Sequence, residues 1–278
     1  MDDTRVDAIA NALANLGYEG IVAFDRTEPE YDTIRALYDR YESTDHVQLL
    51  VTSATTADYQ LNGDAQRFWR ELEAVALSHG RLEAAQDVRD ILGTFMQRKV
   101  NARLNQQKRD RLVRLFHSGF DDWFLANHRT VAPAQVWERL ADGLDTDPSK
   151  KTVVLSMKIY DIARLIEEGE YLAFPHDIPI PCDLQVVRVS QSSGLTESDD
   201  TDHVVQTWGV VMGRVSDQLN RPVSLLRIDS IVWQAGQIIG IHEPDSGAAR
   251  TALVEHFTSV GIGPDPAAEL AEQFTVEM

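Results

Sequence analysis

Apolar residues recur every third or fourth position along most of this chain, and this spacing constrains the fold more than any other feature of the sequence. The segments TRVDAIANALANLG, DAQRFWRELEAVALSHG and RLEAAQDVRDILGTFMQ all follow it, as amphipathic helices do. The first two end on Gly17 and Gly80, and glycine suits the left-handed turn that often follows a helix. Alternating strand patterns are scarce. The sequence therefore predicts an all-α protein.

The length of 278 residues allows a large core, arranged as one domain or as two lobes. We expect one functional unit over residues 1–278, made of two helical lobes around a cleft. No apolar run approaches the ~20 residues that span a bilayer, and the N-terminus lacks the basic and apolar regions of a signal peptide. The single cysteine, Cys182, excludes an internal disulfide. We expect a cytoplasmic monomer without a membrane partner.

The charge of the chain is unusual in amount and in kind. Forty-four acidic residues outnumber 26 basic ones, which gives a formal net charge of −18, and only five of the basic residues are lysines. Acidic surfaces in which arginine replaces lysine are typical of proteins dissolved in concentrated salt. We interpret the charge as a salt adaptation rather than as that of an ordinary acidic protein, so it does not exclude DNA as a partner. At high salt, counterion release contributes less to DNA binding, and stacking and hydrogen bonds must contribute more.

Three of the five lysines lie within nine residues of one another, in the segment SKKTVVLSMKIYDIARL at 149–165. Asp147 or Ser149 can cap a helix that begins near Lys151. Seven residues later, Lys158 lies on the same helical face. The positive end of the helix dipole favours the uncharged amine at Lys151, and only that form is a nucleophile. The alternative is that both lysines are solvated surface charges.

A proline-rich segment, FPHDIPIPCDLQVVRVS at 174–190, follows this helix. Its prolines favour a rigid, extended approach to Asp183, at the start of the next predicted helix. Asp183 is then either a simple helix N-cap or a carboxylate that shares a site with Lys151.

The motifs KTVVL and IPIPCD, with Lys151 and Asp183 separated by 32 residues, resemble those of the archaeal 8-oxoguanine DNA glycosylase/lyases, a family within the helix-hairpin-helix DNA glycosylases. The segments YQLNGDAQRFW at 59–69 and LLRIDSIVWQAG at 225–236 also resemble this family, so the similarity extends over most of the chain. It implies a divergent hairpin and a catalytic helix at about 133–168.

The resemblance also implies a function, which is the excision of 8-oxoguanine from damaged DNA after the base has flipped out of the duplex. Lys151 would form a Schiff base with the sugar, Asp183 would stabilise the developing positive charge, and β-elimination would cleave the strand. The residues implied to hold the base are Trp69, Lys158, Asp229, Trp233, Leu155 and Glu30.

Two of these residues depart from the family pattern. Leu155 replaces a phenylalanine, and Glu30 replaces the glutamine of a DPQY motif, which reads EPEY here. An ionised carboxylate accepts hydrogen bonds but cannot donate one to the base. The sequence lacks a cysteine–histidine cluster of the kind that binds zinc or an iron–sulfur cluster. We therefore expect neither a metal nor a cofactor.

The most basic stretch of the chain is NARLNQQKRDRLVRLFHSG at 101–119. A solvated helix face and a contact with the DNA backbone explain it equally well. The residues concerned are Arg103, Lys108, Arg109, Arg111 and Arg114.

Two other functions are compatible with parts of the pattern. A helix-hairpin-helix protein that binds DNA without catalysis would have the same fold. A helical enzyme that forms Schiff bases with small carbonyl compounds would also need a reactive lysine, but it would not explain the matched tryptophans or the basic stretch.

Overall fold

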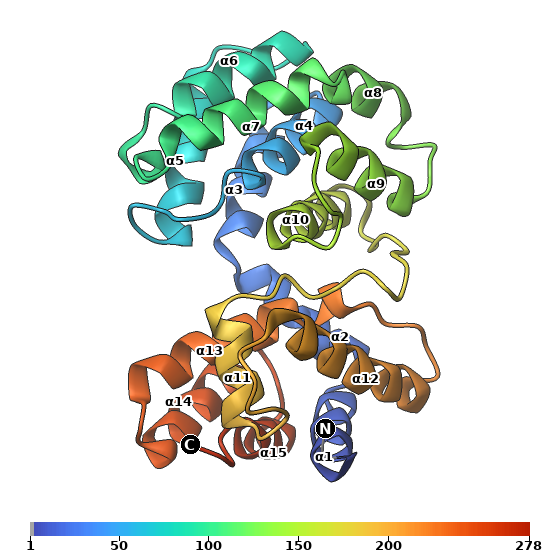
Figure 1. The fold of residues 1–278 in the computed structure, drawn as a ribbon, viewed down its shortest axis with the longest axis vertical. Helices are drawn as coiled ribbons and strands as arrows, with labels where there is room; N and C mark the ends of the chain where they lie inside the picture. Colours follow the sequence, from blue (N-terminus) through green and yellow to red (C-terminus); the bar gives the residue numbers. More distant parts are fainter. Residues whose placement is uncertain (1–2) are drawn as a thin grey trace. The chain divides into compact units, whose positions relative to one another are not determined.

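The computed structural model describes residues 3–278, and within this range the chain forms helices and loops without a β-strand (Figure 1). The all-α class predicted from the apolar spacing is confirmed. The chain divides into two compact units. We call Glu28–Phe174 the central unit, and Met1–Thr27 together with Pro175–Met278 the terminal unit. Both ends of the chain therefore belong to one unit, and the other is a continuous segment.

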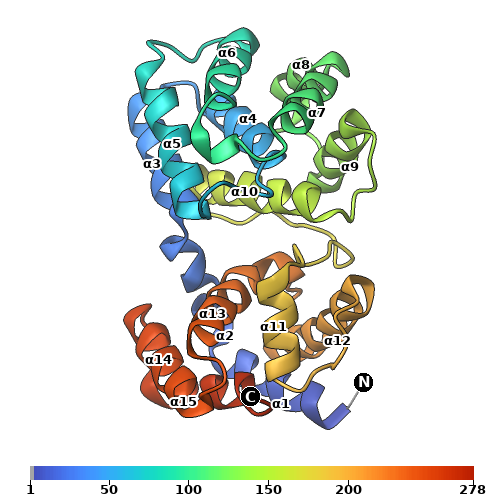
Figure 2. The same ribbon diagram turned by 60° about the vertical axis from the view of Figure 1, so that its left-hand side comes forward.

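The central unit is built around α10 (Lys151–Glu168), which packs against α3, α4 and α9 (Figure 2). Every residue from Ser156 to Arg164 is buried, so this helix is enclosed on most of its circumference. The other helices of the unit are α3 (Pro29–Arg40), α4 (Thr44–Thr55), α5 (Ala65–Ser78), α6 (Ala85–Phe95), η2 (Lys99–Asn101), α7 (Asn105–His117), α8 (Phe120–Asn127) and α9 (Pro133–Leu144).

A polar network holds the C-terminal end of α10. Arg129 donates to Glu167 at 2.7 Å and to Glu168 at 3.2 Å, and it also pairs with Asp45 on α4. The neighbouring His128 is buried and lies 3.1 Å from Asp45 Oδ1. Its burial outweighs the attraction of Asp45 and lowers the pKa of His128 to about 4, so the ring is neutral near pH 7.

In the terminal unit, helices from both ends of the chain pack together. The apolar face of α1 (Asp3–Asn15), with Val6, Ile9 and Leu13, is buried, and α1 packs against α12 (Thr201–Leu219) and α15 (Pro264–Phe274). The other elements are α2 (Gly17–Val22), η1 (Ala23–Thr27), α11 (Leu184–Ser192), η3 (Leu225–Arg227), α13 (Asp229–His242) and α14 (Ser246–Ser259).

Glycine permits the close contact between α11 and α13. A Cβ atom at Gly236 would lie 2.5 Å from the carbonyl oxygen of Gln185, which is closer than real Cβ contacts come. Gly17 has the left-handed backbone expected after a helix, with φ of +67°. Gly80 does not: α5 ends at Ser78 with an extended residue, His79.

Within residues 3–278, every helix is too short or too polar to cross a bilayer. No group of three or more His, Cys, Asp or Glu side chains in this range is arranged to hold a metal ion.

Candidate active site

The hairpin between α9 and α10 positions the first turn of α10. The residue after α9, Asp145, adopts a left-handed conformation, and Trp137 Nε1 donates to the carbonyl oxygen of Pro148 at 2.8 Å. Asp147 Oδ1 accepts from the backbone N–H of Ser149 at 2.8 Å and from its hydroxyl at 2.6 Å. The N-cap of α10 is Lys150, which makes no side-chain cap hydrogen bond. The prediction that Asp147 or Ser149 caps the helix was therefore wrong, because Asp147 closes the turn instead.

The helix begins at Lys151, as the sequence predicted. Lys151 and Leu155 are half-buried, whereas Lys158 is only 3% exposed. Long side chains such as lysine are rarely enclosed in this way unless a charge or polar group compensates them. Lys158 is therefore not a solvated surface charge.

The buried carboxyl group of Glu30 interacts electrostatically with Lys158. Glu30, near the start of α3, is 6% exposed and interacts electrostatically with Lys158, Glu28 and Asp58. Burial raises the pKa of Glu30 well above its usual range, the charge of Glu28 raises it further, and the ammonium of Lys158 opposes both effects. This shift favours the protonated form of Glu30 more than in an exposed glutamate, and a protonated carboxyl both donates and accepts hydrogen bonds.

Trp69, also in the central unit, lies on α5, whose N-cap Asp64 accepts from the backbone N–H of Arg67 at 2.8 Å. Its ring is 2% exposed and meets Phe68 edge to face, with centroids 5.5 Å apart. An enclosed ring of this kind forms part of a wall more readily than an open stacking surface.

In the terminal unit, Asp183 is the N-cap of α11. Its Oδ1 accepts from the backbone N–H groups of Gln185 at 2.8 Å and Val186 at 3.4 Å. The buried side chains of Ile178 and Ile180 anchor the proline-rich approach. These contacts confirm that Asp183 is a helix cap, and they fix the position of its carboxylate.

Asp229 and Trp233 lie one turn apart on α13. Asp229 is buried, and Trp233 is half-buried. Hydrogen bonds to η1 fix this helix: Ser230 donates to Asp25 at 2.6 Å, and Gln234 Nε2 donates to the carbonyl oxygen of Phe24 at 3.2 Å. Of the two predicted stacking residues, Trp233 retains the more accessible ring.

The basic stretch turns several of its side chains inward. Lys108 is fully buried, with its ammonium 5.2 Å from the centre of the Tyr59 ring, and this contradicts the expected contact of Lys108 with a DNA backbone. Arg109 is half-buried and donates to Asn105 of its own helix at 2.8 Å. Arg103 and Arg114 are exposed.

Arg111 contacts α10, which the sequence did not predict. Its Nη2 donates to the Thr152 hydroxyl at 2.7 Å. A helix pattern identifies the residues on one face, but it cannot identify a partner 41 positions away.

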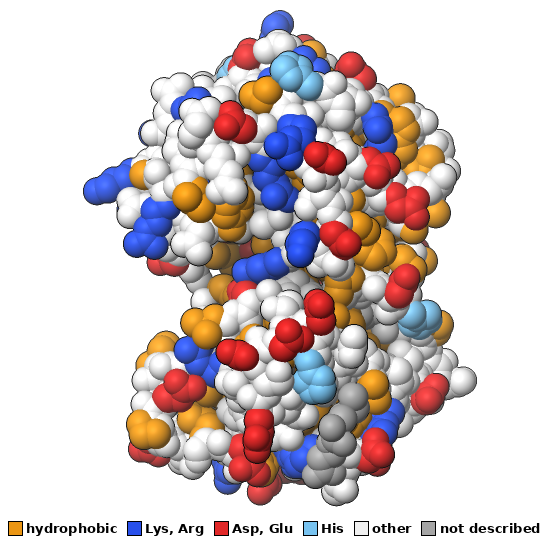
Figure 3. Space-filling model, viewed as in Figure 1, with side chains coloured by type: hydrophobic (Ala, Val, Ile, Leu, Met, Phe, Trp, Pro, Cys, Tyr) orange, Lys and Arg blue, Asp and Glu red, His pale blue; other side chains and the backbone are white. Residues whose placement is uncertain are grey.

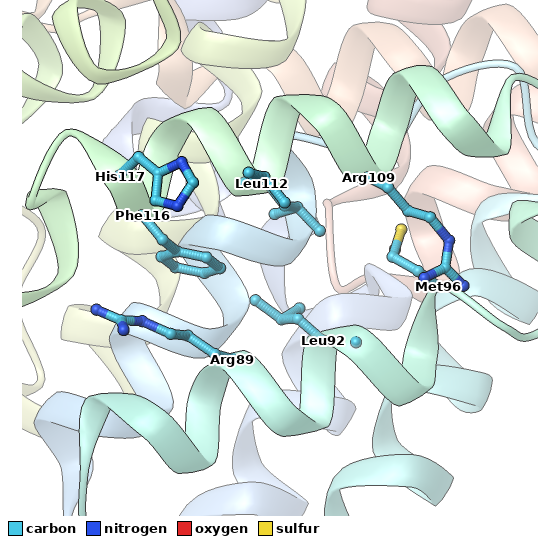
Figure 4. Close-up of a pocket in the computed structure, with 9 residues that line it drawn as sticks. Arg89, Leu92, Met96, Arg109, Leu112, Phe116 and His117 are labelled. Atoms are coloured by element: carbon cyan, nitrogen blue, oxygen red, sulfur yellow. The ribbon is translucent and has the colours of Figure 1, made fainter.

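A cavity of about 280 Å³ lies between α6 and α7, on the central unit (Figure 4). It is lined mainly by apolar side chains, among them Leu92, Met96 and Phe116, and Arg109 is the one predicted site residue in its lining. This cavity is thus distinct from the residues expected to carry the chemistry.

Comparisons with known proteins identify the family. The model of the AGOG family, described as N-glycosylase/DNA lyase, matches residues 10–270. A Methanopyrus kandleri N-glycosylase/DNA lyase is 29% identical over 208 residues, which are 73% of this chain and 78% of the relative. A Pyrobaculum aerophilum N-glycosylase/DNA lyase is 23% identical over 258 residues, or 90% and 93% of the two chains.

The fold is also similar to a solved one. The crystal structure of Pyrobaculum aerophilum Pa-AGOG, an 8-oxoguanine DNA glycosylase complexed with 8-oxoguanosine, superposes with a TM-score of 0.72 at 18% identity and covers 98% of this chain and 97% of the other. With the family match over residues 10–270, the chain belongs to the AGOG family of N-glycosylase/DNA lyases.

Proposed function

We propose that this N-glycosylase/DNA lyase excises 8-oxoguanine from DNA through a Schiff base on Lys151 and then cleaves the strand by β-elimination. The observation that carries the proposal is the position of Lys151, the first residue of the helix that follows the hairpin, in a chain whose family match spans residues 10–270. The name of the similar Pyrobaculum aerophilum structure supports 8-oxoguanine as the base.

The base would be held by the residues that the family resemblance implies. Trp233 would stack on the flipped base, Trp69 and Leu155 would form apolar walls, and Lys158, Asp229 and Glu30 would bind its polar edge. Protonated Glu30 would supply one donor and one acceptor, which is the capacity of an amide side chain. This offers a physical reason why a glutamate can stand where the resembling family has a glutamine.

The proposed covalent steps need no cofactor. The uncharged amine of Lys151 attacks C1′ of the sugar, and the bond from C1′ to the base breaks, so the base leaves with the bonding electrons and takes up a proton. Cleavage of the bond between C1′ and the ring oxygen then gives the Schiff base. Loss of a C2′ proton expels the 3′ phosphate, and water releases the enzyme. Asp183 would stabilise the positive charge that develops on the sugar.

We further propose that residues 1–278 act as one catalytic unit, with the hairpin and catalytic helix at about 133–168, and that the enzyme works as a cytoplasmic monomer. The steps above need groups from a single copy of the chain. Light scattering of the enzyme with and without an oligonucleotide measures the oligomeric state.

The decisive experiment is borohydride trapping on an oligonucleotide that contains one 8-oxoguanine. The wild-type enzyme should form a covalent adduct, and Lys151→Gln should form none and release no base, while it stays folded and binds DNA. Lys150→Gln is the matched control, because Lys150 is the adjacent, exposed N-cap residue and should leave trapping intact. A folded Lys151→Gln variant that still forms the adduct would reject Lys151 as the nucleophile.

A further inference from the structure

Helix α7 contacts both ends of the hairpin that leads into the catalytic helix. Arg114 Nη1 donates to the carbonyl oxygen of Leu144, the last residue of α9, at 3.1 Å. One turn earlier on α7, Arg111 Nη2 donates to the hydroxyl of Thr152, the second residue of α10, at 2.7 Å. The residues between these contacts, 145–150, form the hairpin turn.

The contact with Thr152 restrains a first helical turn whose N-cap residue makes no side-chain hydrogen bond. The first N–H groups of any helix lack intrahelical partners, and a side-chain cap usually binds one of them. Here the N-cap residue, Lys150, makes no such bond. The Arg111–Thr152 hydrogen bond therefore provides a tertiary restraint one residue away from Lys151.

The surroundings of Arg111 hold it in this position. The side chain is half-buried, and its Nε is buried without a hydrogen-bond partner in the described structure. Beside it, Lys108 is buried against the ring of Tyr59. Removing an acceptor from a partly desolvated guanidinium leaves one of its N–H groups unpaired, which destabilises the folded protein. The Thr152 hydroxyl is therefore an important partner of Arg111.

We propose that Arg111 is a positioning residue for the Schiff-base step, because its hydrogen bond to Thr152 fixes the first turn of α10 and with it the direction of the Lys151 amine. This inference rests on the proposed role of Lys151. It assigns Arg111 to the catalytic helix rather than to the DNA backbone. Misplacing a reacting group by about 1 Å can cost roughly 100-fold in rate, so a small rotation of this turn matters.

The test replaces the acceptor and leaves the arginine in place. Thr152→Val has nearly the same shape but no hydroxyl, and Thr152→Ser keeps the hydroxyl. Single-turnover excision and borohydride trapping, at saturating damaged oligonucleotide, should slow about tenfold in Thr152→Val and stay within about twofold of wild type in Thr152→Ser. The dissociation constant for DNA should be unchanged in both.

The matched control on α7 is Gln106→Ala. Gln106 is exposed and donates to Asp110 of the same helix at 2.7 Å, so this variant should behave as wild type. Arg111→Gln should reproduce the slow rate of Thr152→Val at unchanged DNA affinity.

Three results would overturn the inference. One is a Thr152→Val variant as fast as wild type, and another is equal slowing by valine and serine. The third is weaker DNA binding by Arg111→Gln with a normal rate at saturation, which would make Arg111 a DNA contact. Failure of the wild-type enzyme to form any adduct would reject the proposed function itself, and the inference with it.

Discussion

Burial raises the pKa of Glu30, and the position of this residue in the sequence does not reveal that change. As an ionised carboxylate it can only accept hydrogen bonds, but the structure buries it, and the charges of Glu28 and Asp58 add to the effect of burial on its pKa while that of Lys158 opposes it. Burial and these two negative charges both disfavour the ionised form of Glu30. The sequence identifies the substitution in the EPEY motif, but it cannot supply the packing of α3 against α10 that sets the protonation state.

Replacing Glu30 with glutamine should remove a pH dependence. The raised pKa of Glu30 means that the folded state prefers the protonated form, so its contribution to stability is complete below the usual glutamate pKa and is lost as pH rises through the raised value. The base-edge donor is lost over the same range. We therefore expect the ratio of Glu30→Gln to wild-type excision rate to increase with pH.

Single-turnover rates and urea unfolding, both measured from pH 5 to 9, check this expectation. Comparing the two proteins at each pH cancels the titration of other groups. A ratio that stays constant across the range would show that Glu30 does not supply a titrating donor.

Asp183 combines a structural and a proposed chemical role in one carboxyl group, and Asp183→Asn separates them. Asparagine can still accept from the backbone N–H groups of Gln185 and Val186, and it caps helices about as well as aspartate. It cannot stabilise a developing positive charge by its own charge. We expect excision to slow about 100- to 1,000-fold, with DNA affinity and melting temperature close to those of wild type. Equal losses of affinity and rate would make Asp183 only a cap.

At the scale of whole elements, contacts between helices position the predicted site residues. The apolar spacing predicted the helices well, including the start of α10 at Lys151, because that signal is local. It did not predict the pairing of α7 with the hairpin or the close crossing of α11 and α13. Such contacts depend on how distant segments meet, as the side chain of Arg111 and the missing side chain of Gly236 illustrate.

A methyl group at the α11–α13 crossing should destabilise the terminal unit. In Gly236→Ala the new Cβ would lie 2.5 Å from a backbone oxygen, and backbone cannot move aside as a flexible side chain does. We expect a loss of about 1–3 kcal/mol in the free energy of unfolding. Excision should also slow, because α11 begins directly after Asp183.

Gly209→Ala, inside α12, is the matched control. Apart from its chain neighbours and the backbone of its own helix, no atom of the described residues lies within 4 Å of a Cβ placed there, so alanine should stabilise that helix by about 0.5–1 kcal/mol. Urea unfolding of both variants measures the difference. Equal effects of the two substitutions would show that the crossing tolerates the added methyl group.

At the scale of the whole molecule, the most unusual property is the excess of acidic over basic residues. The formal net charge is −18, and acidic side chains are scattered over the face shown in Figure 3 rather than gathered in one patch. Repulsion among so many carboxylates destabilises a compact state unless salt screens it. The interpretation of this charge as a salt adaptation stays a prediction, which the following experiment tests.

We therefore predict that the protein needs molar salt to stay folded and that excision persists at salt concentrations that release ordinary DNA-binding proteins. Stacking of a base on an aromatic ring contributes about 1–3 kcal/mol and depends little on ionic strength, and Trp233 has the accessible ring for it. Single-turnover excision from low to molar potassium chloride, with circular dichroism to monitor folding, tests this. A steep loss of activity in folded protein would contradict it.

The discontinuous make-up of the terminal unit has a consequence for biosynthesis. The ribosome produces α1 long before α12 and α15, the helices against which α1 packs. At about 5–20 residues per second, the apolar face of α1 waits on the order of tens of seconds for these partners. The central unit, Glu28–Phe174, is a continuous segment that is synthesised in the meantime. We therefore expect all of its helices, α10 included, to be synthesised while the apolar face of α1 still lacks its partners.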